Sequence, residues 1–266
     1  MQFMGYRRAD GRVGVRNYVL ILPGCACASE TCRLVASEVR GTKNVIMNVG
    51  GSDVQANTDM NLRVLTGFAL NPNVFGVIVI GLGCETVGHR ELAAKIRAET
   101  SKPVVSFGIQ EIGGTVATTA AAVKAAREMV AQASEQQREP CDASDLFVAI
   151  ECGGSDATSG IASNPAVGNM SDRIVDLGGT TMMSETIEFV GAEHILAKRG
   201  ATPEIHDQII RICEDYEKHL AGVGQDCRTG QPTTGNKAGG LSTIEEKSLG
   251  CIHKGGTRPV VEVLQA

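Results

Sequence analysis

VIVIGLGC, residues 77–84, places a cysteine directly after a run of aliphatic, mostly β-branched residues. Two further stretches share this arrangement, YVLILPGC at residues 18–25 and LFVAIEC at residues 146–152. Short aliphatic runs that end in a thiol and polar loop residues are typical of buried parallel strands at their carboxyl ends. Ligands of open α/β sheets sit at that edge, so Cys25, Cys84 and Cys152 are predicted to converge on one metal centre. Core packing of three small apolar residues is the alternative.

The composition narrows the class of protein. A chain of 266 residues can bury one or two hydrophobic cores. The net charge of -5 and the 3% aromatic content argue against nucleic acid or an anionic membrane as a partner. The first residues contain no apolar signal segment, and nine cysteines without one indicate free thiols in a reducing compartment. We therefore expect a cytoplasmic protein with no membrane span.

Strands and helices alternate along the first half of the chain. Strands are predicted at residues 17–23, 44–49, 74–80 and 102–107, and helices at residues 29–40, 57–70, 88–100 and 114–134. This alternation is typical of βαβ units and a parallel sheet, so residues 1–136 are predicted to form a Rossmann-like α/β domain.

A second, smaller α/β domain is predicted at residues 145–266, after a charged linker at residues 137–144. Its strands are predicted at residues 145–151, 179–183 and 258–264, and its helices at residues 166–177, 191–199, 203–221 and 243–249. Residues 222–240 are predicted to be a loop with too little apolar content to order itself by burial. Because the chain ends on a predicted edge strand, we expect a continuation of the sheet and an oligomer.

Two sets of polar residues are predicted to bind substrate. Arg12 and Arg16 precede the first aliphatic run, and their guanidinium groups suit a carboxylate, unless they pair with local acids instead. The segment CGGSD at residues 152–156 follows the third run, and its glycines allow backbone N–H groups to point at an anion. Ser155 and Asp156 are therefore substrate-binding candidates.

Three residues are catalytic candidates. Glu185 follows a predicted strand and could act as a ligand or a base, although the neighbouring Ser184 could simply cap a helix. Lys237 lies in a glycine-rich segment that runs into a helix, next to Asn236, a further substrate-binding candidate. His89 is the histidine that lies closest in sequence to the end of a cysteine-bearing strand.

Several motifs resemble the altronate and galactarate dehydratase family. They are GYRRADGRVGVRN at residues 5–17, NPNV at 71–74, GLGCE at 81–85, CGGSD at 152–156 and GNKAGGLSTIEEKSLG at 235–250. The second half is also similar to the large subunit of sulfolactate sulfo-lyase, notably over residues 138–145 and 201–217.

The resemblance implies a hydro-lyase of sugar acid catabolism that removes water from a hydroxy-carboxylate to give a 2-keto acid. It implies iron, either Fe2+ or an iron–sulfur cluster, held by Cys25, Cys84 and Cys152. Enzymes of the family carry a small antifreeze-like (SAF) domain that this chain lacks, so we expect a large subunit with a separate SAF partner. Two alternatives remain open: a carbon–sulfur lyase that releases sulfite from sulfolactate, and a non-catalytic scaffold or binding subunit.

Overall fold

The chain folds into two compact α/β units, which the computed structural model describes over residues 1–51 and 54–264. The N-terminal unit comprises residues 2–141, and the C-terminal unit comprises residues 142–266 with Met1. None of the helices within the described residues combines the length and the apolar character that crossing a membrane requires.

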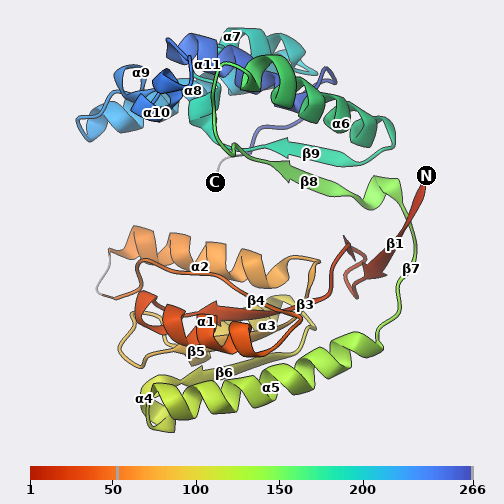
Figure 1. Ribbon diagram of the computed structural model, residues 1–266, viewed down its shortest axis with the longest axis vertical. Helices are drawn as coiled ribbons and strands as arrows, with labels where there is room; N and C mark the ends of the chain where they lie inside the picture. Colours follow the sequence, from red (N-terminus) through yellow and green to blue (C-terminus); the bar gives the residue numbers. More distant parts are fainter. Residues whose placement is uncertain (52–53, 265–266) are drawn as a thin grey trace. The chain divides into compact units, whose positions relative to one another are not determined.

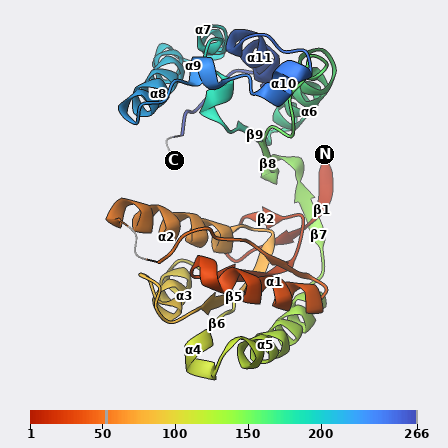
Figure 2. The same ribbon diagram turned by 60° about the vertical axis from the view of Figure 1, so that its left-hand side comes forward.

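A four-stranded parallel sheet forms the centre of the N-terminal unit (Figures 1 and 2). Its strands, in the order β4–β3–β5–β6, are Thr42–Asn44, Tyr18–Pro23, Val74–Gly81 and Val104–Gly108. The two central strands β3 and β5 are paired in parallel register, so their carboxyl ends are neighbours. Cys25 and Cys84 follow these two strands, as the sequence predicts. The predicted strand at 44–49 is wrong in its bounds, because β4 ends at Asn44.

Helices cover both faces of this sheet (Figures 1 and 2). The helices of the unit are α1 (Ser29–Glu38), α2 (Gln55–Leu70), α3 (His89–Glu99), α4 (Ile109–Ile112) and α5 (Thr115–Glu135), with a 3-10 turn at Ala26–Ala28. Side chains of β3 and β5 alternate between a face packed by α1 and α5 and a face packed by α2 and α3. This double coverage explains why both strands are almost continuously apolar.

A second, smaller sheet of this unit is formed by segments that precede and follow the four-stranded sheet in the sequence. It has the order β2–β1–β7, with strands Val13–Gly14, Gln2–Arg7 and Glu139–Asp142. The predicted linker at 137–144 therefore contains a strand, β7. An ion pair of 2.7 Å between Arg7 of β1 and Glu139 of β7 links the two strands. Pro140 within β7 is tolerated because this strand lies at the edge of the sheet, where a missing N–H costs little.

The C-terminal unit is built on two parallel strands, β8 (Phe147–Ile150) and β9 (Thr180–Met183), connected through α6 (Asn164–Asp176). A π-helical turn, Ser159–Ser163, leads into α6. The remaining helices are α7 (Glu193–Leu196), α8 (Pro203–Gly222), α9 (Cys227–Gly230), α10 (Thr234–Ala238) and α11 (Ile244–Cys251), with 3-10 turns at Ala143–Asp145, Thr186–Glu188, Ala197–Arg199 and Ile252–Gly255.

Two predictions for this unit are wrong. Residues 222–240 hold the short helices α9 and α10, which combine local capping with burial of Cys227 in the core. The Asp226 side chain accepts a hydrogen bond from the Arg228 N–H, and Thr233 and Asn236 form a capping box. The predicted strand at 258–264 is reduced to one parallel bridge between Gly200 and Val260.

Candidate functional site

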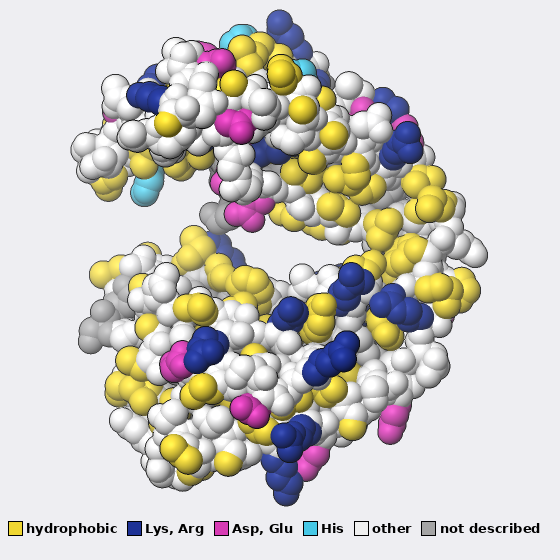
Figure 3. All heavy atoms as spheres, viewed as in Figure 1, with side chains coloured by type: hydrophobic (Ala, Val, Ile, Leu, Met, Phe, Trp, Pro, Cys, Tyr) yellow, Lys and Arg dark blue, Asp and Glu magenta, His cyan; other side chains and the backbone are white. Residues whose placement is uncertain are grey.

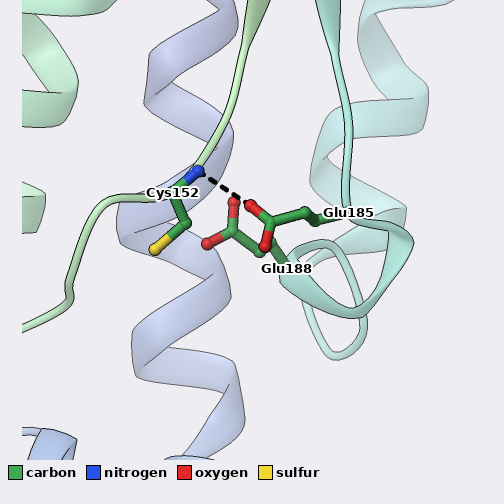
Figure 4. Close-up of side chains that lie close together, drawn as sticks. All are labelled: Cys152, Glu185 and Glu188. Atoms are coloured by element: carbon green, nitrogen blue, oxygen red, sulfur yellow. Dashed lines mark hydrogen bonds between the residues drawn. The ribbon is translucent and has the colours of Figure 1, made fainter. Parts of the chain in front are cut away.

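Three potential ligands meet in the C-terminal unit: the Cys152 thiol and the carboxylates of Glu185 and Glu188. Their ligand atoms all lie within 4.8 Å of one another, and the side chains converge from different segments (Figure 4). Within residues 1–51 and 54–264 this is the one group of three or more cysteine, histidine or acidic side chains at such distances. Perturbed, clustered titratable groups are typical of functional sites.

The two glutamates come from the turn after β9. Glu185 has a left-handed backbone conformation with φ 65°, and among the described residues it is the one non-glycine residue with positive φ. Such a conformation is unfavourable for a residue with a Cβ and often marks a functional constraint. It directs the Glu185 carboxylate back to the end of β8, where Oε2 accepts a hydrogen bond of 2.8 Å from the Cys152 N–H. Glu188 follows in the 3-10 turn and is buried.

Two glycine-rich segments fix the loop that carries Cys152. The Asn236 side chain donates to the Ser155 carbonyl at 2.9 Å, and the Ala157 N–H donates to the Gly239 carbonyl at 3.0 Å. A Cβ on Gly239 would lie 2.9 Å from the Asp156 Cβ, so the close approach needs glycine. The Ser155 hydroxyl, in turn, lies 3.3 Å from the Cys152 sulfur. The sequence-predicted residues Ser155 and Asn236 therefore position the thiol.

A buried ion pair lies beneath this group. Glu188 is 2% exposed, and its carboxylate accepts hydrogen bonds from the Lys254 ammonium and, at 3.3 Å, from the Cys251 thiol. Lys254 is buried as well, and its backbone carbonyl accepts a hydrogen bond of 2.8 Å from the Ser171 hydroxyl of α6. Because two donors hold the Glu188 carboxylate, it is the most rigidly placed of the three ligands.

The electrostatics of the group are dominated by burial and by Glu188. Burial raises the pKa of the Cys152 thiol, and the Glu188 carboxylate adds to the rise, against the hydrogen bond from Ser155. Burial raises the pKa of Cys251 to about 12, again with a contribution from Glu188. Burial alone would lower the pKa of Lys254, but its hydrogen bond and attraction to Glu188 outweigh that effect and raise it.

A pocket of about 220 Å³ shares part of its lining with the surroundings of the group, and this lining combines polar side chains with a larger apolar part. Ser155 and Cys251 belong both to this lining and to the hydrogen-bonded surroundings of the three ligands. The π-helical turn forms one wall and α11 another, and they approach closely because Gly160 faces Gly250. Ser155 and Cys251 therefore connect the pocket to the three ligands, none of which belongs to its lining.

The other two predicted ligands, Cys25 and Cys84, lie in the N-terminal unit. Cys25 is buried after β3, and burial raises the pKa of its thiol, whereas Cys84 is exposed in the loop after β5. Neither joins a group of three close ligands within the described residues. The shared metal centre of the three cysteines stays a prediction.

The loop after β5 has its own internal anion. The Glu85 carboxylate accepts backbone N–H groups of Leu82, Gly83 and His89, at 3.0, 2.6 and 3.2 Å. A Cβ on Gly81 would lie 2.1 Å from a Glu85 oxygen, so the strand end needs glycine there. In dinucleotide-binding folds these N–H groups hold a phosphate. Here the Glu85 carboxylate accepts these N–H groups instead.

The remaining predicted site residues of the N-terminal unit make local contacts. His89 is buried at the first position of α3, with Nε2 3.5 Å from the Glu111 carboxylate and Nδ1 without a hydrogen-bond partner among the described residues. Arg12 pairs with Asp10 at 2.6 Å, which is the local pairing left open from the sequence. The Arg16 guanidinium donates to the neighbouring Val15 carbonyl.

Two predicted residues of the C-terminal unit lie outside the group of ligands. Lys237 is exposed on α10. The Asp156 carboxylate accepts hydrogen bonds from Thr158 and Ser159, which lower its pKa, so it caps the turn before α6. Glu188, Cys251 and Lys254 were not among the residues predicted from the sequence. The signal for Glu188 was its position three residues after Glu185 in a turn.

Comparisons with known proteins cover both units. Residues 5–134 match the second domain of D-galactarate dehydratase/altronate hydrolase, and residues 143–266 match the C-terminal domain of D-galactarate/altronate dehydratase.

Three relatives align with almost the whole chain. The (2R)-sulfolactate sulfo-lyase subunit beta of Chromohalobacter salexigens is 42% identical over 96% of this chain and 65% of its own length. Altronate dehydratase of Bacillus subtilis is 34% identical over 99% of this chain and 54% of its own length. Galactarate dehydratase (L-threo-forming) of Escherichia coli is 35% identical over 98% of this chain and 54% of its own length. The chain thus spans between half and two thirds of the curated relatives it matches, and it belongs to the D-galactarate/altronate dehydratase family.

Proposed function

We propose that this chain is a lyase subunit that removes water from a sugar acid or a related hydroxy-carboxylate and forms a 2-keto acid. The observation that carries the proposal is the convergence of Cys152, Glu185 and Glu188, whose neighbours Ser155 and Cys251 also line a pocket. The relatives with 34% and 35% identity, which are named as dehydratases, support a dehydration.

The group fits a metal ion by charge and by donor chemistry. Two carboxylates lie within 4.8 Å of a thiol, and Lys254 supplies one positive charge against their two negative charges. A divalent cation would supply the missing positive charge, and a mixed sulfur and oxygen donor set suits iron rather than magnesium. We assign Cys152 and Glu188 as ligands, because Glu188 is rigidly held and Cys152 is positioned by Ser155. When bound, the ion would supply Lewis-acid stabilisation of the substrate's carboxylate and hydroxyl oxygens.

Glu185 is assigned as the proton acceptor. It is exposed toward solvent, whereas Glu188 is buried, so a substrate can reach it. One of its oxygens is held by the Cys152 N–H, and the other remains available to a proton. In the reaction, Glu185 takes the proton from the carbon next to the carboxylate, and the hydroxyl of the following carbon leaves as hydroxide, which takes up the proton released from Glu185 to give water. The enol that results then tautomerises to the 2-keto acid. A positioned base of this kind contributes about 10²–10⁴-fold to the rate.

The pocket next to the group suits a polyhydroxylated acid. Its polar lining includes the Ser155 and Ser159 hydroxyls, the Asn164 amide and the Lys247 ammonium. Lys247 donates to the Gln231 side chain at 2.9 Å and retains further N–H donors for a carboxylate. A few placed polar groups in a concave site are the usual basis of small-molecule specificity.

The other sequence-based expectations remain part of this proposal. A Rossmann-like N-terminal unit is supported by its four parallel strands and by helices on both faces. A partner subunit is supported by the name of one relative, a subunit beta, and the SAF domain of that partner is proposed from the family resemblance alone. Contributions of Cys25, Cys84, Arg12 and Arg16 to the same reaction are proposed from the family motifs alone.

Carbon–sulfur cleavage is the second candidate reaction. The relative with 42% identity over 96% of this chain is named as a sulfolactate sulfo-lyase subunit. The chemistry differs only in the leaving group, because removal of the same proton would then expel sulfite instead of hydroxide.

An anaerobic substrate panel tests the proposal. The chain is loaded with Fe2+, with and without a candidate SAF subunit, and is incubated with aldonates, aldarates and (2R)-sulfolactate. We expect a 2-keto acid from at least one aldonate or aldarate, detected with a carbonyl reagent. Sulfite from sulfolactate with no turnover of any sugar acid would replace dehydration by carbon–sulfur cleavage. Failure of every substrate with the complete pair of subunits would contradict both reactions.

A further inference from the structure

A cavity of about 400 Å³ lies at the amino-terminal edge of the parallel sheet in the N-terminal unit. Its lining comes from the loop after β1 (residues 7–10) and from the segment before β6 (residues 99–103), with Phe75 and Gln136. Cys25 and Cys84 follow the opposite ends of the strands, so this cavity lies at the other edge of the sheet.

Two half-buried cations in this lining have no carboxylate partner. The Lys102 ammonium donates to the carbonyls of Ala69 and Asn71, at 2.9 and 2.6 Å. The Arg8 guanidinium donates to the carbonyls of Pro72 and Arg16 and to the Gln136 side chain, at 2.7, 3.1 and 3.2 Å. No carboxylate of the described residues forms an ion pair with either group. Buried charges are normally paired, so this arrangement needs an explanation.

The other charged groups near the cavity do not neutralise these two. Arg7 pairs with Glu139 at 2.7 Å, Arg12 pairs with Asp10 at 2.6 Å, and Lys95 lies 4.0 Å from Glu99. The charges of Arg8 and Lys102 therefore have no ion-pair partner, although the Asp10 carboxylate in the same lining offsets them in part. Figure 3 shows Lys and Arg side chains gathered over the region of β1 and β3 on the face that it displays.

Both cations also retain unused hydrogen-bond donors. An ammonium has three N–H donors, and the two carbonyls use two of those on Lys102. A guanidinium has five, and the three acceptor oxygens use three of those on Arg8. Burial lowers the pKa of Lys102 to about 8, with a further contribution from the positive charge of Arg8. An anion between the two groups would relieve this repulsion.

We propose that this cavity binds an organic phosphate, whose phosphoryl group lies between Arg8 and Lys102. A phosphoryl group carries close to two negative charges at neutral pH and offers three acceptor oxygens, which match the excess charge and the unused donors. The volume is that of a small-molecule pocket and is larger than an inorganic ion needs. The proposal does not rest on the lyase reaction, because the residues belong to the N-terminal unit alone.

Competitive labelling of lysines in the intact wild-type chain tests the proposal. Lys102 is acetylated with acetic anhydride at pH 8, and the extent is read by mass spectrometry with and without glycerol 3-phosphate or inorganic phosphate. At ten times the dissociation constant, either probe should slow the labelling of Lys102 roughly tenfold. Lys124 and Lys218, which are exposed, should label at unchanged rates. Glycerol 3-phosphate should act at the lower concentration.

Two variants and two further anions complete the test. Arg8→Gln should weaken the protection by about 10- to 100-fold, the loss expected for a charge-assisted hydrogen bond, and Arg33→Gln, on the exposed face of α1, should not. Chloride at equal ionic strength should leave the labelling rate of Lys102 unchanged. Unchanged Lys102 labelling up to about 10 mM of either phosphate would overturn the proposal. Equal protection by malonate would overturn the phosphate assignment, and protection by inorganic phosphate alone would overturn the organic ligand.

Discussion

Replacing Glu188 by alanine is expected to lower the free energy of unfolding by about 3–5 kcal/mol. Glu188 and Lys254 form an ion pair with side chains that are 2% and 7% exposed, and Cys251 donates a further hydrogen bond to the same carboxylate. Removing the carboxylate leaves the Lys254 charge buried and unpaired, and the cost of that state exceeds the value of the pair itself. Denaturant unfolding of the purified chain measures the change.

A second pair in the same chain provides the control. Glu30 and Arg33 form an ion pair of 2.6 Å, but their side chains are 63% and 53% exposed. Glu30→Ala should leave the unfolding midpoint essentially unchanged, because water solvates the charge that remains. The double change Glu188→Leu with Lys254→Met should recover most of the lost stability. Equal destabilisation by Glu30→Ala and Glu188→Ala would show that burial does not set the strength of this pair.

Glu185→Gln is expected to lower turnover by about 10²–10⁴-fold while metal binding persists. The amide keeps the shape of the carboxylate and can still accept the Cys152 N–H, so the turn after β9 should remain intact. The amide cannot take up a proton, so the elimination should lose its base. The measurement combines kcat with the iron content of the same preparation.

The outcome separates two roles for Glu185. Loss of iron in Glu185→Gln would make it a ligand rather than the base, and unchanged turnover would remove it from the reaction. Glu204→Gln is the matched control, because Glu204 is an exposed glutamate of α8 in the same unit, and it should change neither quantity.

Much of the fold could be predicted because the hydrophobic pattern of the sequence indicates where its strands and helices lie. The aliphatic runs of β3 and β5 are buried on both faces, and their lengths follow directly from the sequence. β7 was missed because Pro140 and its charged neighbours are typical of a linker, and only pairing with β1 makes the segment a strand. The apolar residues at 258–264 failed as a strand for the opposite reason. These residues have β-propensity, but within the described part of the chain they form a single bridge, between Val260 and Gly200.

The site could be predicted only in part. Cys152, Glu185, Ser155 and Asn236 could be singled out because each follows a strand or lies in a glycine-rich segment, where side chains are held by the backbone, and their roles stay predictions. Lys254 and Cys251 lie about 100 residues further along the chain from Cys152 and reach Glu188 through the packing of α6 against the C-terminal turns. Tertiary contacts of this kind leave no local pattern in a single sequence.

The most direct measurement of the central claim is the iron affinity of the anaerobically prepared chain with Cys152 changed to serine. Cys213→Ser is the matched control, because Cys213 is a buried cysteine of the same unit that packs in the core around Val190. Parallel Cys25→Ser and Cys84→Ser variants show whether the N-terminal cysteines reach the same ion. We expect wild type and Cys213→Ser to bind Fe2+ with equal affinity. Cys152→Ser should lose about 100-fold or more in Fe2+ affinity, because changing residues that only support a metal ligand already lowers metal affinity by about 10- to 100-fold. Equal Fe2+ binding by Cys152→Ser and wild type would contradict this expectation.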